Sequence, residues 1–117
     1  MGQPIMHVEI IGRDARALQR FYGELFGWRI SPAGGPETGF YGLVDSATSG
    51  VAGGIGQAEA GQSRVTFYVQ VPDMQAALDQ AAALGGKTLM PPMDVPGGPR
   101  IALFADPDGN VVGLMQG

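Results

Sequence analysis

The pattern of hydrophobic and polar positions predicts the same series of elements twice along this chain. Short apolar strands are expected at residues 5–11 and 64–71, where apolar side chains alternate with polar ones or form a short continuous run. Asp14 and Asp73 follow these strands, at positions where a carboxylate can accept the unpaired backbone N–H groups of a helix start. A helix is therefore expected after each of the two strands.

Each predicted helix carries apolar residues at helical spacing, which form one stripe along its surface. The two stripes consist of Leu18, Phe21, Tyr22 and Leu25 in the first helix and of Met74, Ala77, Leu78, Ala81 and Leu84 in the second. Gly27 and the pair Gly85–Gly86 are expected to end the helices, because glycine readily adopts the left-handed conformation that terminates many helices.

Three further strands are expected after each helix. They are predicted at residues 28–30, 40–44 and 51–57 in the first half of the chain and at 87–90, 100–105 and 111–116 in the second. Residues 106–110 are typical of a tight turn, because proline presets φ, glycine permits a positive φ, and Asp and Asn bond back to the backbone. Residues 45–50 form a weaker equivalent. The proline-rich loops 31–38 and 91–99 are expected outside the sheet, either as rims of a cavity or as plain connections.

A repeat with an offset of 59 residues relates the two halves of the chain. Eleven pairs of identical residues have this separation, among them Asp14 with Asp73 and Gly54 with Gly113. A constant offset from end to end indicates two copies of one β-α-β-β-β unit. We therefore predict an α+β fold, in which units of about residues 1–58 and 59–117 form one domain and their curved mixed sheets form a cleft.

Composition narrows the range of partners. The 117 residues suffice for one domain with a core that both units share. A net charge of -4 without a basic run disfavours binding to nucleic acid or to an anionic membrane. The lack of cysteine excludes disulfides and thiolate chemistry. Neither a bilayer-spanning apolar run nor a secretion signal is found, so we expect a cytoplasmic location.

Several motifs resemble those of the vicinal oxygen chelate superfamily. The motifs are His7-Val8-Glu9-Ile10, Phe21-Tyr22-Gly23-Glu24-Leu25-Phe26-Gly27-Trp28, Gly85-Gly86-Lys87 and Phe104-Ala105-Asp106-Pro107-Asp108-Gly109-Asn110. The resemblance covers the whole chain and concerns the fold, since one fold can support many reactions. The superfamily includes glyoxalase I, bleomycin-resistance and fosfomycin-resistance proteins, extradiol dioxygenases and methylmalonyl-CoA epimerase. The resemblance also implies a homodimer, in some members with exchanged units.

The resemblance further implies where a metal would be bound. In metal-dependent members each unit supplies one ligand from its first strand and one from its last, and the corresponding positions here are His7, Gly54, Thr66 and Gly113. Only His7 is a competent ligand, whereas a catalytic metal normally needs about three protein ligands. The sequence therefore predicts no metal and no other cofactor.

These positions and nearby aromatic residues are instead candidates for a small-molecule site. The residues that we select as ligand-binding are His7, Trp28, Tyr41, Gly54, Thr66, Tyr68, Met93, Phe104 and Gly113. Gly54 and Gly113 would leave an open apolar hole, or the pair Gly53–Gly54 forms a bulge or a close strand crossing, and both can hold together. Met93 would act as a lid from its loop. For the aromatic residues, ordinary packing in the core is at least as good an explanation.

His7 and Glu9 are also the candidates for chemistry. They lie on the same face of the first strand, and Thr66 and Tyr68 follow the same parity in the equivalent strand. His7 could hydrogen-bond a ligand, or it could move a proton together with Glu9. Alternatively, both are structural residues, and the partner of Glu9 is then one of three arginines, namely Arg13, Arg29 or Arg100.

Three functions remain after these considerations. The first is a metal-independent protein that binds an apolar or aromatic small molecule, as antibiotic-sequestering resistance proteins of the superfamily do. The second is a lyase, isomerase or dioxygenase that uses His7 as metal ligand or as acid/base with Glu9. The third is an interaction or regulatory domain whose cleft is vestigial.

Overall fold

A computed structural model describes residues 2–58 and 63–117, which form two compact units. The N-terminal unit is His7–Val65, and the C-terminal unit combines Thr66–Gly117 with Met1–Met6. The start of the chain is tied to the C-terminal unit by the Gln70 N–H, which donates to the Pro4 carbonyl at 2.9 Å. The predicted boundary between residues 58 and 59 borders the segment 59–62, which lies outside the described residues.

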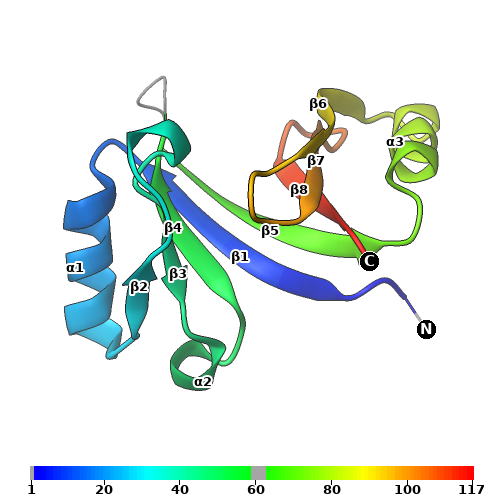
Figure 1. Ribbon diagram of the computed structural model, residues 1–117. Helices are drawn as coiled ribbons and strands as arrows, with labels where there is room; N and C mark the ends of the chain where they lie inside the picture. The colour runs from blue at the N-terminus through cyan, green and yellow to red at the C-terminus, as the bar shows by residue number, and fades with distance from the viewer. Residues whose placement is uncertain (1, 59–62) are drawn as a thin grey trace. The chain divides into compact units, whose positions relative to one another are not determined.

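The N-terminal unit contains one long helix and a four-stranded mixed sheet (Figure 1). Its elements are β1 (Ile5–Gly12), α1 (Ala15–Phe26), β2 (Ile30–Pro32), the 3-10 helix η1 (Pro36–Thr38), β3 (Gly42–Val44), α2 (Ser46–Ser49) and β4 (Gly53–Gln57). The strand order is β2-β3-β4-β1, with β1 and β4 parallel and the other pairs antiparallel.

The C-terminal unit repeats this arrangement. Its elements are β5 (Arg64–Val71), α3 (Met74–Ala83), β6 (Lys87–Asp94), β7 (Arg100–Ala105) and β8 (Val111–Gln116). The strand order is β5-β8-β7-β6, with β5 and β8 parallel. The register also repeats: Glu9 lies opposite Gly54, and their equivalents Tyr68 and Gly113 lie opposite each other. The predicted α+β fold of two β-α-β-β-β units is confirmed.

The predicted helix ends are confirmed as well. Asp14 accepts a hydrogen bond from the Ala17 N–H at 3.1 Å, and Asp73 accepts one from the Ala76 N–H at 3.0 Å. Gly27 ends α1 in the left-handed conformation with φ of 71°. These caps start both helices and end α1 where the sequence predicts, whereas α3 ends at Ala83 with Leu84 as its C-cap, and Gly85 follows with φ of 100°.

The apolar stripe predicted for α1 is partly wrong. Phe21 and Leu25 are 57% and 59% exposed, although the pattern placed them with Leu18 and Tyr22 on the buried side. Leu18 does face the sheet, since a Cβ added at Gly12 would lie 2.5 Å from its Cδ1 atom. The buried or half-buried positions of α1 are Ala15, Leu18, Gln19, Tyr22 and Gly23, so the covered face is displaced towards Ala15 and Gln19 and leaves residues 21 and 25 outside it.

The stripe predicted for α3 agrees better with the structure. Met74 and Leu78 are buried in a core cluster whose other members are Val71, Ala102 and Leu114. Leu84, the last residue of the predicted stripe, is 72% exposed because α3 ends at Ala83. The core of the C-terminal unit therefore lies between α3 and strands β5, β7 and β8 (Figure 1).

The expectation that Pro91 and Pro92 lie outside the sheet is wrong, because β6 continues through both prolines to Asp94. The register between β6 and β7 shifts between Met90 and Met93, and β6 is the last strand in the sheet order. Prolines are tolerated there, since an edge strand or irregularity does not require every N–H for the ladder. Met93 is consequently a strand residue opposite Ile101, not part of a loop.

The two turn predictions differ in outcome. Asp106 accepts hydrogen bonds at 2.9 Å from the N–H groups of Asp108 and Asn110, and Gly109 has φ of 91°. The side-chain amide of Asn110 also donates to Asp106 Oδ2 at 2.9 Å. This bond first, and then the backbone bond from Asn110, lower the pKa of the exposed Asp106 carboxyl, because they stabilise its charged form. The weaker turn at residues 45–50 is instead the single-turn helix α2, capped by Asp45. None of the helices in the described ranges has the length and apolar character that crossing a membrane requires.

Candidate functional site

A chain of hydrogen bonds joins four polar side chains of the N-terminal unit. The Tyr41 hydroxyl lies 2.9 Å from His7 Nε2 and donates a 2.9 Å hydrogen bond to Glu9 Oε2. Arg64 Nη2 donates to the other carboxylate oxygen, Glu9 Oε1, at 3.3 Å and forms an ion pair with it. The Glu9 side chain is only 11% exposed, so these hydrogen bonds and the ion pair offset the cost of burying its carboxylate. The structure thus brings the two candidates His7 and Glu9 together through Tyr41.

The direction of these hydrogen bonds determines the tautomer of His7. A carboxylate can only accept, so the single hydroxyl proton of Tyr41 points to Glu9. The Tyr41 oxygen must then accept from His7, and Nε2 carries a hydrogen. His7, Tyr41 and Glu9 therefore form a relay in which each hydrogen points towards the carboxylate.

His7 is held in its neutral form. Burial lowers its pKa below the usual value of 6.5, because a charged imidazolium loses hydration there, and the nearby Glu9 charge offsets part of this effect. A neutral imidazole at physiological pH can accept a proton or bind an uncharged polar group.

An unusual backbone conformation places Tyr41 in this chain. Gly39 and Phe40 both have positive φ, 64° and 52°, and a left-handed Phe costs roughly 1–2 kcal/mol. Gln19 of α1 offsets this cost, since its Nε2 donates to the Phe40 carbonyl at 2.9 Å and to the Ile55 carbonyl at 2.8 Å. The predicted strand 40–44 consequently begins only at Gly42.

The Tyr41 ring fills the space above Gly54. A Cβ added at Gly54 would lie 1.9 Å from the Tyr41 hydroxyl oxygen and 2.2 Å from a ring carbon. Such distances are far shorter than any contact between non-bonded atoms. Glycine is therefore required at residue 54 if Tyr41 is to reach both His7 and Glu9.

The same arrangement occurs in the C-terminal unit with a different tyrosine. A Cβ added at Gly113 would lie 2.3 Å from the ring of Tyr68, which is 3% exposed. The expectation of an open apolar hole above Gly54 and Gly113 is therefore wrong, because an aromatic ring occupies each one. The alternative of a close strand crossing at Gly53–Gly54 agrees with the structure at Gly53, where an added Cβ would lie 2.7 Å from the Val8 carbonyl oxygen of β1.

The other selected residues lie in separate surroundings. Trp28 stacks on Tyr22, with ring centroids 5.7 Å apart. Phe104 packs against the core cluster of the C-terminal unit, as the packing alternative predicted. Met93 is 46% exposed on β6. Thr66 is buried, and its hydroxyl has no hydrogen-bond partner within the described part of the chain.

The side chains present do not supply a usual ligand set for a divalent metal. No three or more His, Cys, Asp or Glu side chains come together in the ranges 2–58 and 63–117. His7 Nε2 is engaged by Tyr41, and both oxygens of Glu9 already accept hydrogen bonds. The chemistry of this site therefore rests on a neutral imidazole, a phenol and a carboxylate–guanidinium pair.

Sequence analysis missed Arg64 and Gln19. Two of the arginines considered for Glu9 pair elsewhere, Arg29 with Asp45 and Arg100 with Asp94. Arg64 begins β5 and is separated from Glu9 by 55 residues, so no local pattern along the chain connects the two. Gln19 is a polar residue beside the predicted apolar stripe of α1. This position was the one sign that its side chain could bond to residues on which the helix packs.

Comparison with known proteins identifies the family. The sequence model of the family described as "Glyoxalase-like domain" matches residues 7–115. The chain belongs to this glyoxalase-like family. Its fold and motifs also place it in the vicinal oxygen chelate superfamily, as the sequence motifs predicted.

Named relatives are about one third identical to this chain within the aligned regions. "Putative glyoxylase CFP32" of Mycobacterium bovis is 31% identical over an alignment of 114 positions, which covers 93% of this chain and 44% of that protein. "Anthracycline biosynthesis protein DnrV" of Streptomyces peucetius is 32% identical over an alignment of 124 positions, which covers 89% of this chain and 45% of that protein. This glyoxalase-like chain thus spans less than half the length of these relatives.

Solved structures confirm the fold at lower identity. A variant of methylmalonyl-CoA epimerase from Streptomyces coelicolor, in complex with 2-nitronate-propionyl-CoA, has a TM-score of 0.68 and 18% identity. The comparison covers 97% of this chain and 96% of that one. At this identity the similarity concerns the fold alone.

The state of His7 predicts how stability depends on pH. Because its folded-state pKa lies below 6.5, the unfolded chain binds a proton that the folded chain resists. The free energy of unfolding should therefore decrease as the pH falls below about 6.5, and the titration of His7 should not change it above that pH. Urea denaturation of wild type and His7→Gln between about pH 8 and about pH 5.5 measures the effect.

Glutamine can still donate to Tyr41 but does not titrate. The free energy of unfolding of His7→Gln should therefore decrease less towards acid pH than that of wild type. His7 is the only histidine of the chain, so the difference between the two proteins isolates its titration. Identical declines would contradict a depressed pKa at His7.

The contact between Gly54 and Tyr41 predicts strong coupling between these positions. Gly54→Ala should destabilise the protein by about 1–3 kcal/mol, because the added methyl group forces the Tyr41 ring out of its place. In a Tyr41→Ala background the same change should cost far less. A double-mutant cycle by chemical denaturation measures this coupling, and additive effects would contradict the contact.

Proposed function

We propose that this glyoxalase-like chain binds a small organic molecule without a divalent metal. The observation that carries the proposal is the pair of tyrosine rings above Gly54 and Gly113. Both glycines occupy last-strand positions where metal-dependent members of the superfamily carry a ligand. A ring at each position takes the space of a metal ligand, and Tyr41 adds a phenol beside His7, which suits an organic ligand better than a metal ion.

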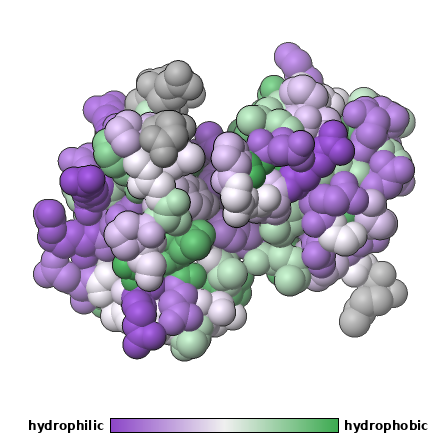
Figure 2. Space-filling model, viewed as in Figure 1, coloured by the Kyte–Doolittle hydropathy of each residue, from purple (hydrophilic) through white to green (hydrophobic). Residues whose placement is uncertain are grey.

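The surroundings of His7 define the class of ligand. A neutral imidazole offers one polar anchor without charge, and the overall charge of -4 favours a neutral or cationic molecule. Figure 2 shows a hydrophobic area on the visible face of the N-terminal unit, over strands β3 and β4. Leu43 of β3 is 48% exposed. These features favour an apolar or aromatic ligand that carries one hydrogen-bonding group.

Metal analysis combined with ligand binding tests the proposal. Purified protein should contain no stoichiometric metal, and Ni²⁺, Zn²⁺, Mn²⁺ and Fe²⁺ should not raise its melting temperature. Two probes follow from the names of related proteins: an anthracycline, which matches this ligand class, and methylmalonyl-CoA, an anion that tests whether the net charge of the chain excludes such ligands. Binding of at least one, measured by calorimetry, should weaken roughly tenfold in His7→Ala, because the ligand loses its polar anchor.

Asp79→Ala on the exposed side of α3 is the control and should bind like wild type. Stoichiometric metal that is lost in His7→Ala would overturn the proposal. Binding of both probes that is unaffected by His7→Ala would contradict the role of His7 as anchor.

Proton transfer is the second candidate function, and the relay from His7 through Tyr41 to Glu9 favours it. A neutral imidazole with a depressed pKa can remove a proton from carbon next to a carbonyl group. The resulting imidazolium would keep its Nε2–H bond to Tyr41, whose hydroxyl donates to the Glu9 carboxylate. The electron pair left behind would form an enolate with the carbonyl group. If His7 exchanges its proton with solvent before returning it to the same carbon, hydrogen exchange is complete, whereas an isomerisation requires delivery to another carbon or to the opposite face.

Deuterium exchange into methylmalonyl-CoA, followed by NMR in D₂O, tests this second function. Exchange should increase with pH through a pKa below 6.5, because only neutral His7 acts as a base. Tyr41→Phe should slow exchange at least about tenfold and shift this pH profile, since it removes the hydroxyl and keeps the ring.

Tyr22→Phe provides a matched control, because Tyr22 stacks on Trp28 and contributes no hydroxyl to the relay. Exchange that is absent, or that proceeds equally fast in His7→Gln, would contradict proton transfer. In that case metal-free binding would be tested independently by the calorimetry.

A further inference from the structure

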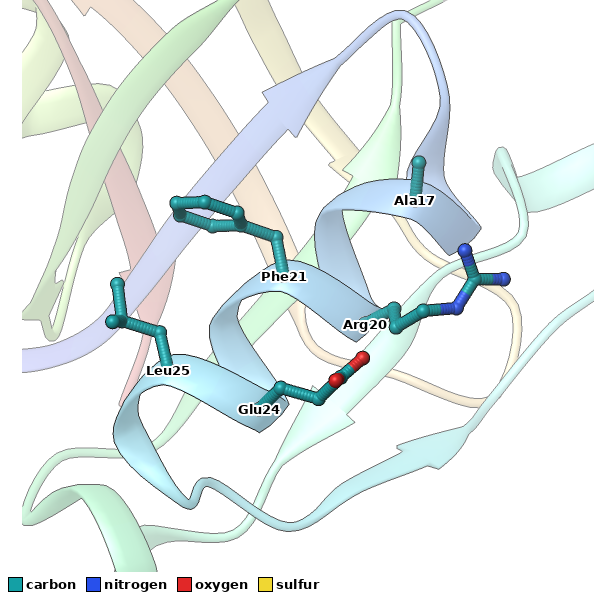
Figure 3. A pocket seen from close by; sticks show the side chains of 5 residues that line it. All are labelled: Ala17, Arg20, Phe21, Glu24 and Leu25. Atoms are coloured by element: carbon teal, nitrogen blue, oxygen red, sulfur yellow. The ribbon is translucent and has the colours of Figure 1, made fainter.

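The outer side of α1 carries an apolar stripe that the N-terminal sheet does not cover. Ala17, Phe21 and Leu25 follow one another at intervals of four residues, and all three are exposed. Figure 3 shows Phe21 and Leu25 pointing to the same side of the helix, along a shallow hollow. An exposed aromatic and aliphatic stripe on a capped, regular helix is typical of a docking surface.

Two opposite charges border this stripe along one flank. Arg20 and Glu24 complete the lining of the hollow and project from the same side of α1 (Figure 3). Neither side chain takes part in an ion pair with any residue of the described ranges 2–58 and 63–117. Both charges are therefore available to a partner.

The order of these charges makes the surface complementary to itself. If a second α1 packs antiparallel across the stripe, a two-fold axis near residue 22 lies between the helices. Because Arg20 and Glu24 lie on the same flank and at equal distances from residue 22, each arginine then faces the glutamate of the other copy. Phe21 of each copy lies near the centre of the contact.

We propose that α1 is a self-association surface, which pairs antiparallel with α1 of a second copy of this chain. The sequence resemblance implied a homodimer, and this surface gives it a specific geometry without exchange of units. The helix has 12 residues and is roughly 18 Å long, so its contact alone is smaller than a standard interface. A weak, concentration-dependent dimer is expected.

Charge reversal tests the proposed geometry. Arg20→Glu places two glutamates opposite each other, and Glu24→Arg does the same with two arginines. Each variant alone should raise the dimer dissociation constant at least about tenfold in sedimentation equilibrium, because like charges meet across the two-fold axis. High salt should weaken the wild-type dimer, since the facing charges are screened.

A mixture of the two variants gives the decisive result. In the mixed dimer, the new carboxylate at position 20 of the first variant would face the new guanidinium at position 24 of the second. The unchanged Glu24 and Arg20 would face each other, so equimolar mixing should restore association. Phe21→Ser should also weaken the dimer. Leu84→Ser, which removes a similarly exposed apolar side chain after α3, is the control and should not.

Three outcomes would overturn the proposal. The first is a wild-type monomer at all concentrations up to the millimolar range, as would result if the stripe were covered within one chain. The second is a dimer that tolerates both charge reversals, which would indicate another interface or exchanged units. The third is a mixture that associates no better than either variant alone. Circular dichroism verifies that each variant keeps its helices.

Discussion

The site depends on the contact between the ring of Tyr41 and the backbone at Gly54. This contact sets the position of the Tyr41 hydroxyl, and the hydroxyl in turn links His7 to the buried Glu9 carboxylate. The left-handed Gly39–Phe40 pair, the two hydrogen bonds of Gln19 and the ion pair with Arg64 all serve the same geometry. The absence of a Cβ at Gly54 thus permits the position of Tyr41, and with it the backbone conformation of residues 39–40, the tautomer of His7 and the polarity of the site.

Local rules predicted most of the fold. Asp14 and Asp73 act as caps because a carboxylate before a helix has one evident set of partners, and the glycine signals are equally local. The errors arose where tertiary structure decides. Periodicity cannot tell how wide a face the sheet covers on α1, so Phe21 and Leu25 were assigned to the core. Pro91 and Pro92 lie in β6 because the strand is irregular there, which composition alone does not reveal.

The site could be predicted only in part. Alternation along β1 correctly placed His7 and Glu9 on one face, and the repeat correctly singled out Gly54 and Gly113. The residues that fill the space above these glycines could not be inferred, because Tyr41 reaches Gly54 through a backbone conformation that few non-glycine residues adopt. The arginine that faces Glu9 likewise lies 55 residues away along the chain, where no local pattern points to it.

The two units fill equivalent gaps by unrelated routes. Glu9 and Tyr68 occupy the same place in the repeat and the same register beside a glycine. In the C-terminal unit the ring is the side chain of Tyr68 at that position. In the N-terminal unit the position holds the Glu9 carboxylate, and the ring belongs to Tyr41. The two halves of the repeat are therefore no longer interchangeable. A symmetrised chain built from two N-terminal halves would carry Ile5 at the position of Arg64 and would lose the cation that pairs with Glu9. One built from two C-terminal halves would carry threonine and tyrosine in place of His7 and Glu9, and so would have no such relay.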